Sequence, residues 1–266
     1  MRYLLLAFSF FWMIESTYSQ EVSNTSFPLG EHIKFKIYYG WFGLGEASMS
    51  IADSLITVNN EHFYRTQVEA KTTGLFSWIS GIQNIYWGDV NTGNYKTIVS
   101  EKHINDRKGK FDQWNTFDYD KMQTDVVMMK YYRDEPRREV TVDLTKNTYD
   151  IHGTYMYLRS KLWSGFNMGD SLLMTTYWED DLYDFGMEYG GTNKIKFDGK
   201  KVTAHKFYAL FPVSGTFPKE KAVTFWIMEK NGVGIPLLIE AEMKIGKVRC
   251  ELKEYSAGNL NLMVAE

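Results

Sequence analysis

Apolar and polar residues alternate with a period of two along most of this chain. In residues 32–39, Ile33, Phe35 and Ile37 fall on one face of an extended segment, and polar residues lie between them. Residues 47–51 repeat the pattern. Successive side chains of a strand point to opposite faces, so this alternation is typical of an antiparallel sheet with one buried face. The same period predicts further strands at residues 63–72, 84–90, 95–104, 111–119, 124–131, 195–197, 202–207, 222–228, 235–243 and 248–254.

Turn sequences between these segments indicate how the strands are joined. Asp198-Gly199 and Asn231-Gly232 each stand between two predicted strands. Glycine tolerates a positive φ, so both pairs predict two-residue hairpins. A twisted open sheet rarely stays open beyond roughly 10 strands, so about a dozen strands predict a sheet that curls. We therefore expect an all-β fold with one or two short helices, in which a curved antiparallel sheet forms a closed or partly open barrel. A two-sheet sandwich is the alternative.

Two segments break the alternation. Asp150 is a good N-cap residue, and apolar residues follow it at helical spacing as far as Leu162, which predicts a helix. The apolar cluster between Gly74 and Gly81 suits a short amphipathic helix or a packed loop. The chain contains no Pro- or Ser-rich linker and no sharp internal repeat, so residues 20–266 are predicted to form a single β domain.

The N-terminus has the pattern of a signal peptide. Arg2 precedes an apolar run over residues 3–14, and Thr17-Tyr18-Ser19 offers small residues at the positions that a signal peptidase recognises. We expect a signal peptide over residues 1–19 with cleavage before Gln20. The apolar run is shorter than the roughly 20 residues that span a bilayer as a helix, and no later stretch reaches that length. The mature chain is therefore predicted to be exported and soluble.

Composition narrows the possible partners. The formal net charge is −3, which gives no electrostatic reason to expect binding to nucleic acid or to an anionic membrane. The only cysteine, Cys250, excludes an intrachain disulfide, and its alternating strand context predicts a buried structural thiol. Aromatic residues make up 16% of the chain. Rings are favoured in strands, so most are expected in packing, and some can line a binding surface.

Three stretches of the sequence carry a family resemblance. They are Gly30-Glu31 with the strand to Tyr39 and Gly43-Leu44-Gly45-Glu46-Ala47; Asp150 with Tyr157-Leu158-Arg159 and Gly169-Asp170; and Phe225-Trp226-Ile227 with Gly234-Ile235-Pro236, Ile239-Glu240-Ala241 and Ile245-Gly246. Together and in this order they resemble the bacterial exported family named domain of unknown function 3108. The resemblance implies export in a bacterium of Gram-negative type, hence a periplasmic location. It also implies a curved sheet or half-barrel like that of periplasmic lipoprotein carriers. It carries over no catalytic residue.

Arg159 is the first candidate for a ligand contact. It lies on the predicted helix beside Tyr155 and Tyr157, and its planar guanidinium could bind an anionic group at the opening of the sheet. The alternative, which is favoured, is a structural ion pair or hydrogen bonds to strand carbonyls that hold the helix on the sheet. Trp226 and Trp78 are further candidates, because aromatic rings at a barrel mouth can stack on sugars or grip acyl chains. Core packing is the alternative for both.

No catalytic or metal-binding pattern stands out. The five histidines form no HxH, HxxxH or HExxH pair, and the chain has neither a Gly-x-Ser-x-Gly elbow nor a glycine-rich phosphate loop before a helix. Glu179, Asp180, Asp181 and Asp184 form the densest acidic cluster and are weak candidates for calcium, with a solvated acidic turn as the alternative. We expect no cofactor and no metal.

Three hypotheses follow for the function. The first is a non-catalytic periplasmic protein that binds a lipid-like or envelope-derived ligand in a groove of the curved sheet. The second is a carbohydrate-binding or carbohydrate-active protein, a hydrolase or lyase, with exposed aromatic residues in a polar-rimmed cleft. The third is a structural interaction module, for which the interior of the sheet would be filled by side chains. Enzymatic activity is the less favoured expectation.

Overall fold

The computed structural model describes residues 27–79, 81–107, 109–131, 137–161, 165–178, 180–214, 217–230, 233–244, 246–258 and 260–263. The predicted signal peptide and the predicted Asn231-Gly232 turn lie outside the described residues. The elements are β1 (His32–Tyr39), β2 (Phe42–Ile51), β3 (Ile56–Val58), β4 (Glu61–Thr72), α1 (Gly74–Ile79), β5 (Gln83–Asn91), β6 (Thr97–Asp106), β7 (Gly109–Asp118), β8 (Gln123–Lys130), β9 (Arg138–Asp143), β10 (Thr148–Asp150), α2 (Ile151–Ser160), β11 (Ser171–Trp178), β12 (Asp181–Phe197), β13 (Lys200–Leu210), β14 (Val223–Lys230), β15 (Val233–Met243), β16 (Gly246–Ala257) and β17 (Leu260–Met263).

All the described strands belong to one sheet of 17 strands. From one edge to the other the main neighbours are β9, β8, β7, β6, β5, β4, β2, β1, β16, β15, β14, β13, β12, β11 and β10, with β3 added beside β4 and β17 beside β16. The pairings are antiparallel except that between β10 and β11. The predicted hairpin at Asp198-Gly199 joins β12 to β13, and both residues have the positive φ that this turn requires.

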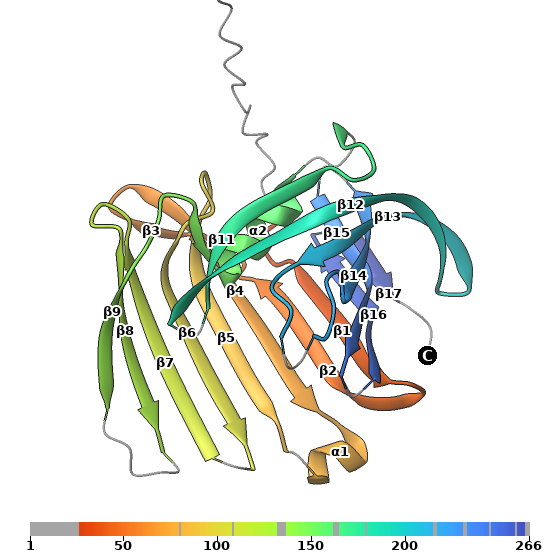
Figure 1. Ribbon diagram of the computed structural model, residues 1–266, viewed down its shortest axis with the longest axis horizontal. Coiled ribbons are helices and arrows are strands. Elements are labelled where there is room, and N and C mark those ends of the chain that lie inside the picture. Colours follow the sequence, from red (N-terminus) through yellow and green to blue (C-terminus); the bar gives the residue numbers. More distant parts are fainter. Residues whose placement is uncertain are drawn as a thin grey trace, which may run out of the picture.

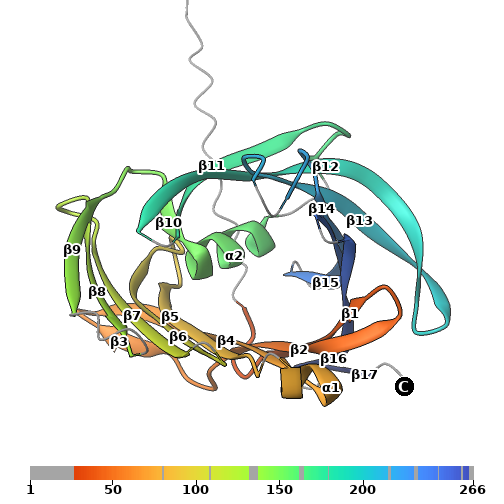
Figure 2. The same ribbon diagram turned by 60° about the horizontal axis from the view of Figure 1, so that its bottom comes forward.

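The sheet curls into a partly open barrel, as the strand pattern predicts (Figures 1 and 2). Its two edge strands, β9 and β10, follow each other in the chain, and the described residues contain no ladder between them. Register shifts interrupt several ladders, for example between Lys34 and Phe35 and between Asp89 and Val90. Such bulges bend a strand and increase its twist, which helps a long sheet to curl instead of remaining flat.

Helix α2 lies inside the curve of the sheet (Figure 2). Its N-cap is Asp150, whose side chain accepts a hydrogen bond from the Gly153 N–H at 2.7 Å. On one face of the helix, Met156 packs with a buried cluster from β2, β4 and β5. Leu158 packs with a second cluster from β11 to β14. The helix therefore bridges opposite parts of the curved sheet and divides its interior.

Candidate ligand-binding groove

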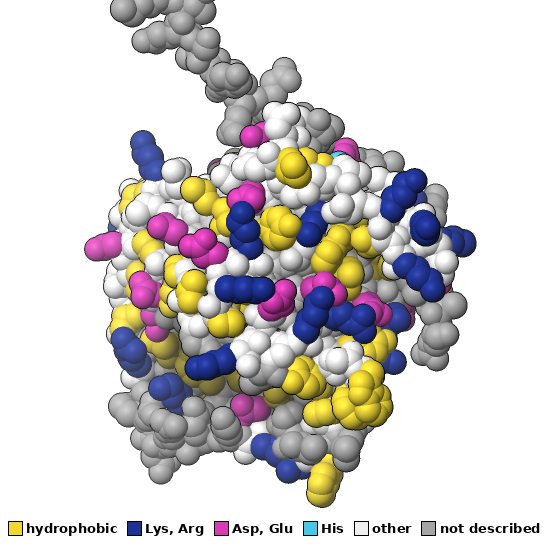
Figure 3. Space-filling model, turned by 45° about the vertical axis from the view of Figure 1, so that its right-hand side comes forward, with side chains coloured by type: hydrophobic (Ala, Val, Ile, Leu, Met, Phe, Trp, Pro, Cys, Tyr) yellow, Lys and Arg dark blue, Asp and Glu magenta, His cyan; other side chains and the backbone are white. Residues whose placement is uncertain are grey.

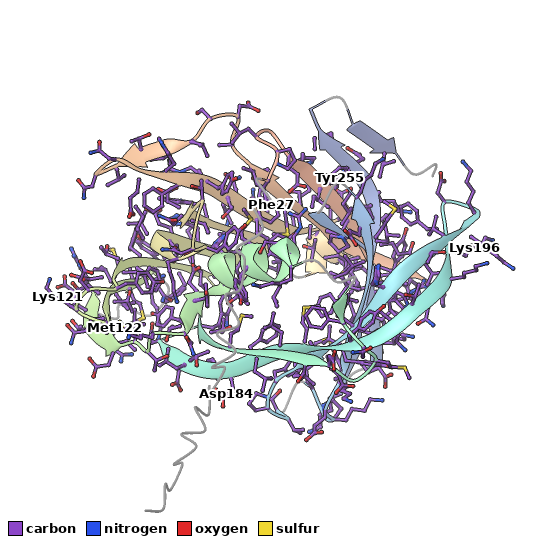
Figure 4. All side chains as sticks on the ribbon, turned by 90° about the horizontal axis from the view of Figure 1, so that it is seen from above. Phe27, Lys121, Met122, Asp184, Lys196 and Tyr255 are labelled. Carbon is purple, nitrogen blue, oxygen red and sulfur yellow. The ribbon has the colours of Figure 1, made fainter. Side chains whose placement is uncertain are left out.

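A buried ion pair fixes α2 against the sheet. The Arg159 guanidinium donates two hydrogen bonds to the Glu31 carboxylate, at 2.7 and 2.8 Å, and a third from Nε to the Gly234 carbonyl at 2.8 Å. The Tyr255 hydroxyl donates to the same carboxylate at 2.9 Å. Arg159 and Glu31 are only 4% and 2% exposed. Figure 4 shows Phe27, whose ring faces the guanidinium at 5.0 Å, above the helix.

The contacts of Arg159 join residues from all three stretches that carry the family resemblance. Glu31 comes from the first stretch that carries the family resemblance, Arg159 from the second and Gly234 from the third. Burial by itself would lower the pKa of Arg159, but the adjacent Tyr155 and Glu31 raise it above the ordinary value. The guanidinium therefore remains charged and bound to protein acceptors. These contacts are those expected from the structural interpretation of Arg159.

Two adjacent apolar cavities lie between α2 and the inner face of the sheet. The first has a volume of about 220 Å³ and lies between α2 and strands β1, β2, β12, β14 and β15. The second, of about 260 Å³, lies between α2 and strands β2, β4, β5 and β11. Met49, Ile151 and Tyr155 line both, so the two cavities are adjacent, and we call them together the groove.

The groove is unusual because its apolar walls are not fully packed. Met49, Phe185, Phe225 and Ile239 line it and are only half-buried. Ile151, in the first turn of α2, is 41% exposed. A protein interior is normally filled to the density of an organic crystal, so inward-facing apolar side chains that retain accessible surface mean that the described residues do not fill the groove.

A small polar cavity continues the groove at one end. It shares Tyr86, Ile151, His152 and Trp178 with the second apolar cavity and has a volume of about 30 Å³. Residues with hydrogen-bonding side chains from β6, β7 and β11 line it; they are Ser100, Glu101, Lys102, Gln113, Asn115 and Tyr177. Several of them bond to one another, as in the contact of 3.1 Å from Asn115 Nδ2 to Ser100 Oγ. The whole space is therefore amphipathic, with a long apolar part and a short polar end.

The residues singled out from the sequence are only partly brought together. Tyr155 and Arg159 line the groove, with Tyr155 half-buried on the surface that faces it. Tyr157 points elsewhere and stacks on Tyr149 with ring centres 5.0 Å apart. Trp226 packs partly buried against the cluster around β1, β15 and β16. Trp78 is 73% exposed on α1. Neither tryptophan lines the cavities described above.

The acidic residues do not converge either. Asp180 Oδ1 accepts hydrogen bonds from Gln113 Nε2 at 3.1 Å and from the Tyr177 hydroxyl at 3.3 Å. Asp181 Oδ1 instead accepts a hydrogen bond from the backbone N–H of the next residue, Leu182. Asp184 lies exposed on β12 (Figure 4). Glu179 lies outside the described residues. Within the part of the chain that the structure describes, no group of three or more His, Cys, Asp or Glu side chains could hold a metal ion.

Most groove residues were not identifiable as candidates from the sequence. Phe35, Met49 and Phe225 were visible only as members of an alternating apolar face, because the same pattern describes a filled core. The polar end gives even less signal. Lys102, Gln113 and Asn115 occupy inward positions of two adjacent strands, and in a sequence such polar residues indicate only a solvent-facing side of a sheet.

The outer surface differs from the groove. Figure 3 shows basic and acidic side chains interspersed over one face, with apolar side chains scattered between them. No helix in the described ranges is both long and apolar enough to cross a membrane.

Fold and groove together define a class of protein: a curved antiparallel sheet wrapped around the helix α2. The family model described as "Protein of unknown function (DUF3108)" matches residues 34–253, and the chain belongs to this family. A solved structure, a beta-barrel-like protein of domain of unknown function DUF1849 from Brucella abortus, is similar with a TM-score of 0.54. The alignment covers 88% of this chain and 100% of the other at 8% identity, which shows a shared fold. Comparison with curated proteins gives no match.

Proposed function

We propose that this protein is exported and binds a lipid-like amphiphile non-covalently in the groove, as a carrier or receptor and not as an enzyme. The observation that supports this function is the pair of adjacent apolar cavities between α2 and the sheet, lined by half-buried side chains. The predicted leader and the family resemblance support a location in the periplasm.

The size of the groove favours a long apolar chain. A dry apolar cavity of roughly 150 Å³ is large enough to take up benzene or xenon. Each of the two adjacent cavities, of about 220 and 260 Å³, is larger than that. Burial of one methylene contributes about 0.8 kcal/mol, and association costs about 4–15 kcal/mol. A ligand that binds mainly by its chain therefore needs on the order of ten buried methylenes.

Ile151 offers a direct test of this proposal, because it lines all three cavities and is partly exposed. The Ile151→Glu variant places a charge in the groove at the first helical position, where the helix dipole favours a carboxylate. Met168→Glu is the matched control, since Met168 is 79% exposed and lines none of these cavities.

The proteins are purified without detergent and examined by native mass spectrometry, with extraction of any bound lipid. We expect an amphiphile on the wild type and on Met168→Glu, and loss of most of it on Ile151→Glu. Wild-type protein that carries no amphiphile and binds none added in excess would refute the proposal.

A carbohydrate ligand is the second candidate, and one observation favours it. The rings of Tyr86 and Trp178, with centres 5.9 Å apart, stand beside the polar cavity that contains Gln113 and Asn115. Aromatic rings next to amide side chains are suited to sugars. Saturable binding of a free oligosaccharide by wild-type protein that carries no amphiphile would favour this function over lipid binding. A purely structural module predicts a filled interior, whereas the described residues leave the groove open.

A further inference from the structure

The hairpin between β1 and β2 ends in exposed aromatic side chains. Tyr39 pairs with Phe42, so Gly40 and Trp41 form a two-residue loop, in which Gly40 has the positive φ that glycine adopts without strain. Trp41 is 81% exposed and stacks on Phe42, which is 45% exposed, with ring centres 3.7 Å apart. Large apolar rings grouped at the surface mark a place where a protein contacts another molecule or a membrane.

Further exposed aromatic side chains lie at the same end of the barrel. The last residue of β4, Thr72, pairs with Gly45 near the start of β2, so α1, which follows β4, stands near the β1–β2 hairpin (Figure 1). Trp78 of α1 is 73% exposed. Tyr131 follows β8 and is 51% exposed, and its N–H donates a hydrogen bond at 3.0 Å to the Lys110 carbonyl, beside the turn between β6 and β7. We call these exposed rings the aromatic rim; they are Tyr39, Trp41, Phe42, Trp78 and Tyr131.

Exposed cations stand among the rings of the aromatic rim. The Arg107 guanidinium, in the turn between β6 and β7, lies 5.7 Å from the centre of the Trp78 ring. Lys244 is exposed in the turn between β15 and β16. The Gly40 N–H donates a hydrogen bond at 3.4 Å to the Lys247 carbonyl, which places that turn beside the β1–β2 hairpin. Figure 3 shows apolar side chains protruding at the lower edge of the molecule, with basic side chains near them. Although the whole chain has a formal charge of −3, its surface at this end combines aromatic rings with cations.

A lipid bilayer fits this surface better than a folded protein does. Tryptophan and tyrosine concentrate at membrane interfaces, where one part of the ring is apolar and another is wet, and cations contact the phosphates of anionic lipids. Interfaces between proteins instead enclose their aromatic anchors in pockets. None of the cavities described above is lined by a residue of the aromatic rim. The rings come from separate connections at one end of the barrel, so the surface of a bilayer can contact several of them together.

We propose that the aromatic rim docks this protein peripherally on the surface of a lipid bilayer. The rings of Trp41, Phe42 and Trp78 enter the headgroup region, and the neighbouring cations contact lipid phosphates. This inference goes beyond the proposed function, because docking requires no ligand in the groove. For a carrier of lipid-like molecules, it supplies the contact with the membrane at which such a ligand is exchanged.

The first test is flotation of the purified protein with vesicles of phosphatidylcholine, and with vesicles of phosphatidylcholine and phosphatidylglycerol in equal parts. We expect the wild type to float with both and to bind the anionic vesicles more tightly. Trp41→Ala and Trp78→Ala should each lower the partition coefficient roughly ten-fold, because each removes the burial of one large ring. Trp41→Phe keeps a ring and should retain most of the binding. Met168→Ala is the matched control, since Met168 is 79% exposed and lies outside the aromatic rim.

The second test reports the position of the rings directly. Lipids with brominated acyl chains quench the fluorescence of a tryptophan that enters the bilayer, so such vesicles should quench the wild type more strongly than the double variant of Trp41→Ala and Trp78→Ala. Neither tryptophan lines the groove, so this variant should keep the same amount of bound amphiphile as the wild type, and docking is tested separately from the proposed function.

Three results would overturn this inference. The first is wild-type protein that floats with neither kind of vesicle. The second is flotation that the double variant and Met168→Ala retain equally. The third is a dimer in analytical ultracentrifugation that the double variant dissociates, without flotation of the wild type, because the aromatic rim would then bind a second copy of the chain.

Discussion

The ion pair between Glu31 and Arg159 makes a sharp prediction about stability. In the Arg159→Met variant, the Glu31 carboxylate remains buried with only the Tyr255 hydroxyl as its described donor, and the Gly234 carbonyl loses the guanidinium. Removing one partner of a buried pair costs about 3–5 kcal/mol. For a chain of this size each kcal/mol corresponds to about 2–4 °C, so the melting temperature should fall by roughly 6–20 °C.

A double-mutant cycle separates the ion pair from the packing of the arginine. The free energy of unfolding is measured by urea denaturation with circular dichroism for wild type, Arg159→Met, Glu31→Leu and the double variant. Replacing both partners by apolar residues leaves no uncompensated charge. The double variant should therefore lose less free energy of unfolding than the two single variants lose in sum. Arg249→Met is the surface control: Arg249 lies 3.5 Å from Glu251 at a partly exposed position, and its loss should cost less than about 1 kcal/mol.

Two results would refute this reasoning. One is a loss below about 1 kcal/mol for Arg159→Met, which would mean that the carboxylate is not held in a dry site. The other is additivity of the two single substitutions within about 0.5 kcal/mol, which would mean that the side chains do not act as a pair.

Two further predictions follow from burial. Cys250 is half-buried, not fully buried as predicted, and this burial raises the pKa of its thiol to about 11. At pH 8 the native protein should therefore react with a disulfide reagent roughly a hundred-fold more slowly than the urea-unfolded chain, and similar rates would contradict the raised pKa. Burial also lowers the pKa of Lys96 from 10.5 to about 8, so the unfolded chain holds more protons above pH 8 and the free energy of unfolding should rise with pH. Urea denaturation between pH 8 and 9.5 should show a steeper rise for wild type than for Lys96→Met, and equal slopes would exclude this shift.

Much of the fold was predictable because its signals are local. The alternation over residues 32–39 appears as β1, with Ile33 and Phe35 buried. Asp150 heads α2 as its N-cap, and the helix ends at Ser160, before the predicted Leu162. These features depend on neighbouring residues alone, since side-chain period, capping and turn geometry act within a few positions.

The strands that were missed lack such signals. The strand β11 contains an exposed Leu173 and a buried Thr176, which is the reverse of the expected pattern. The strand β12 contains Gly186, whose Cα faces the Leu172 carbonyl so closely that a Cβ would lie 2.4 Å from it. The strand β6 begins at Thr97 and not at the predicted Tyr95, because Tyr95 adopts a positive φ in the preceding turn. In these cases contacts with neighbouring strands outweighed local preference.

By itself, the sequence determined that the chain forms extended antiparallel strands, with a capped helix in the middle and an apolar face to bury. The tertiary structure alone decided what that face encloses. Arg159 binds Glu31, which lies 128 positions away in the chain, and Phe225 and Met49 line the same groove. No local pattern encodes such distances, because curvature, register shifts and the position of α2 arise only when all the strands pair. A fully packed interior and one that contains a groove therefore show the same alternation in the sequence. The structure distinguishes them, because it shows where inward-facing side chains leave space unfilled.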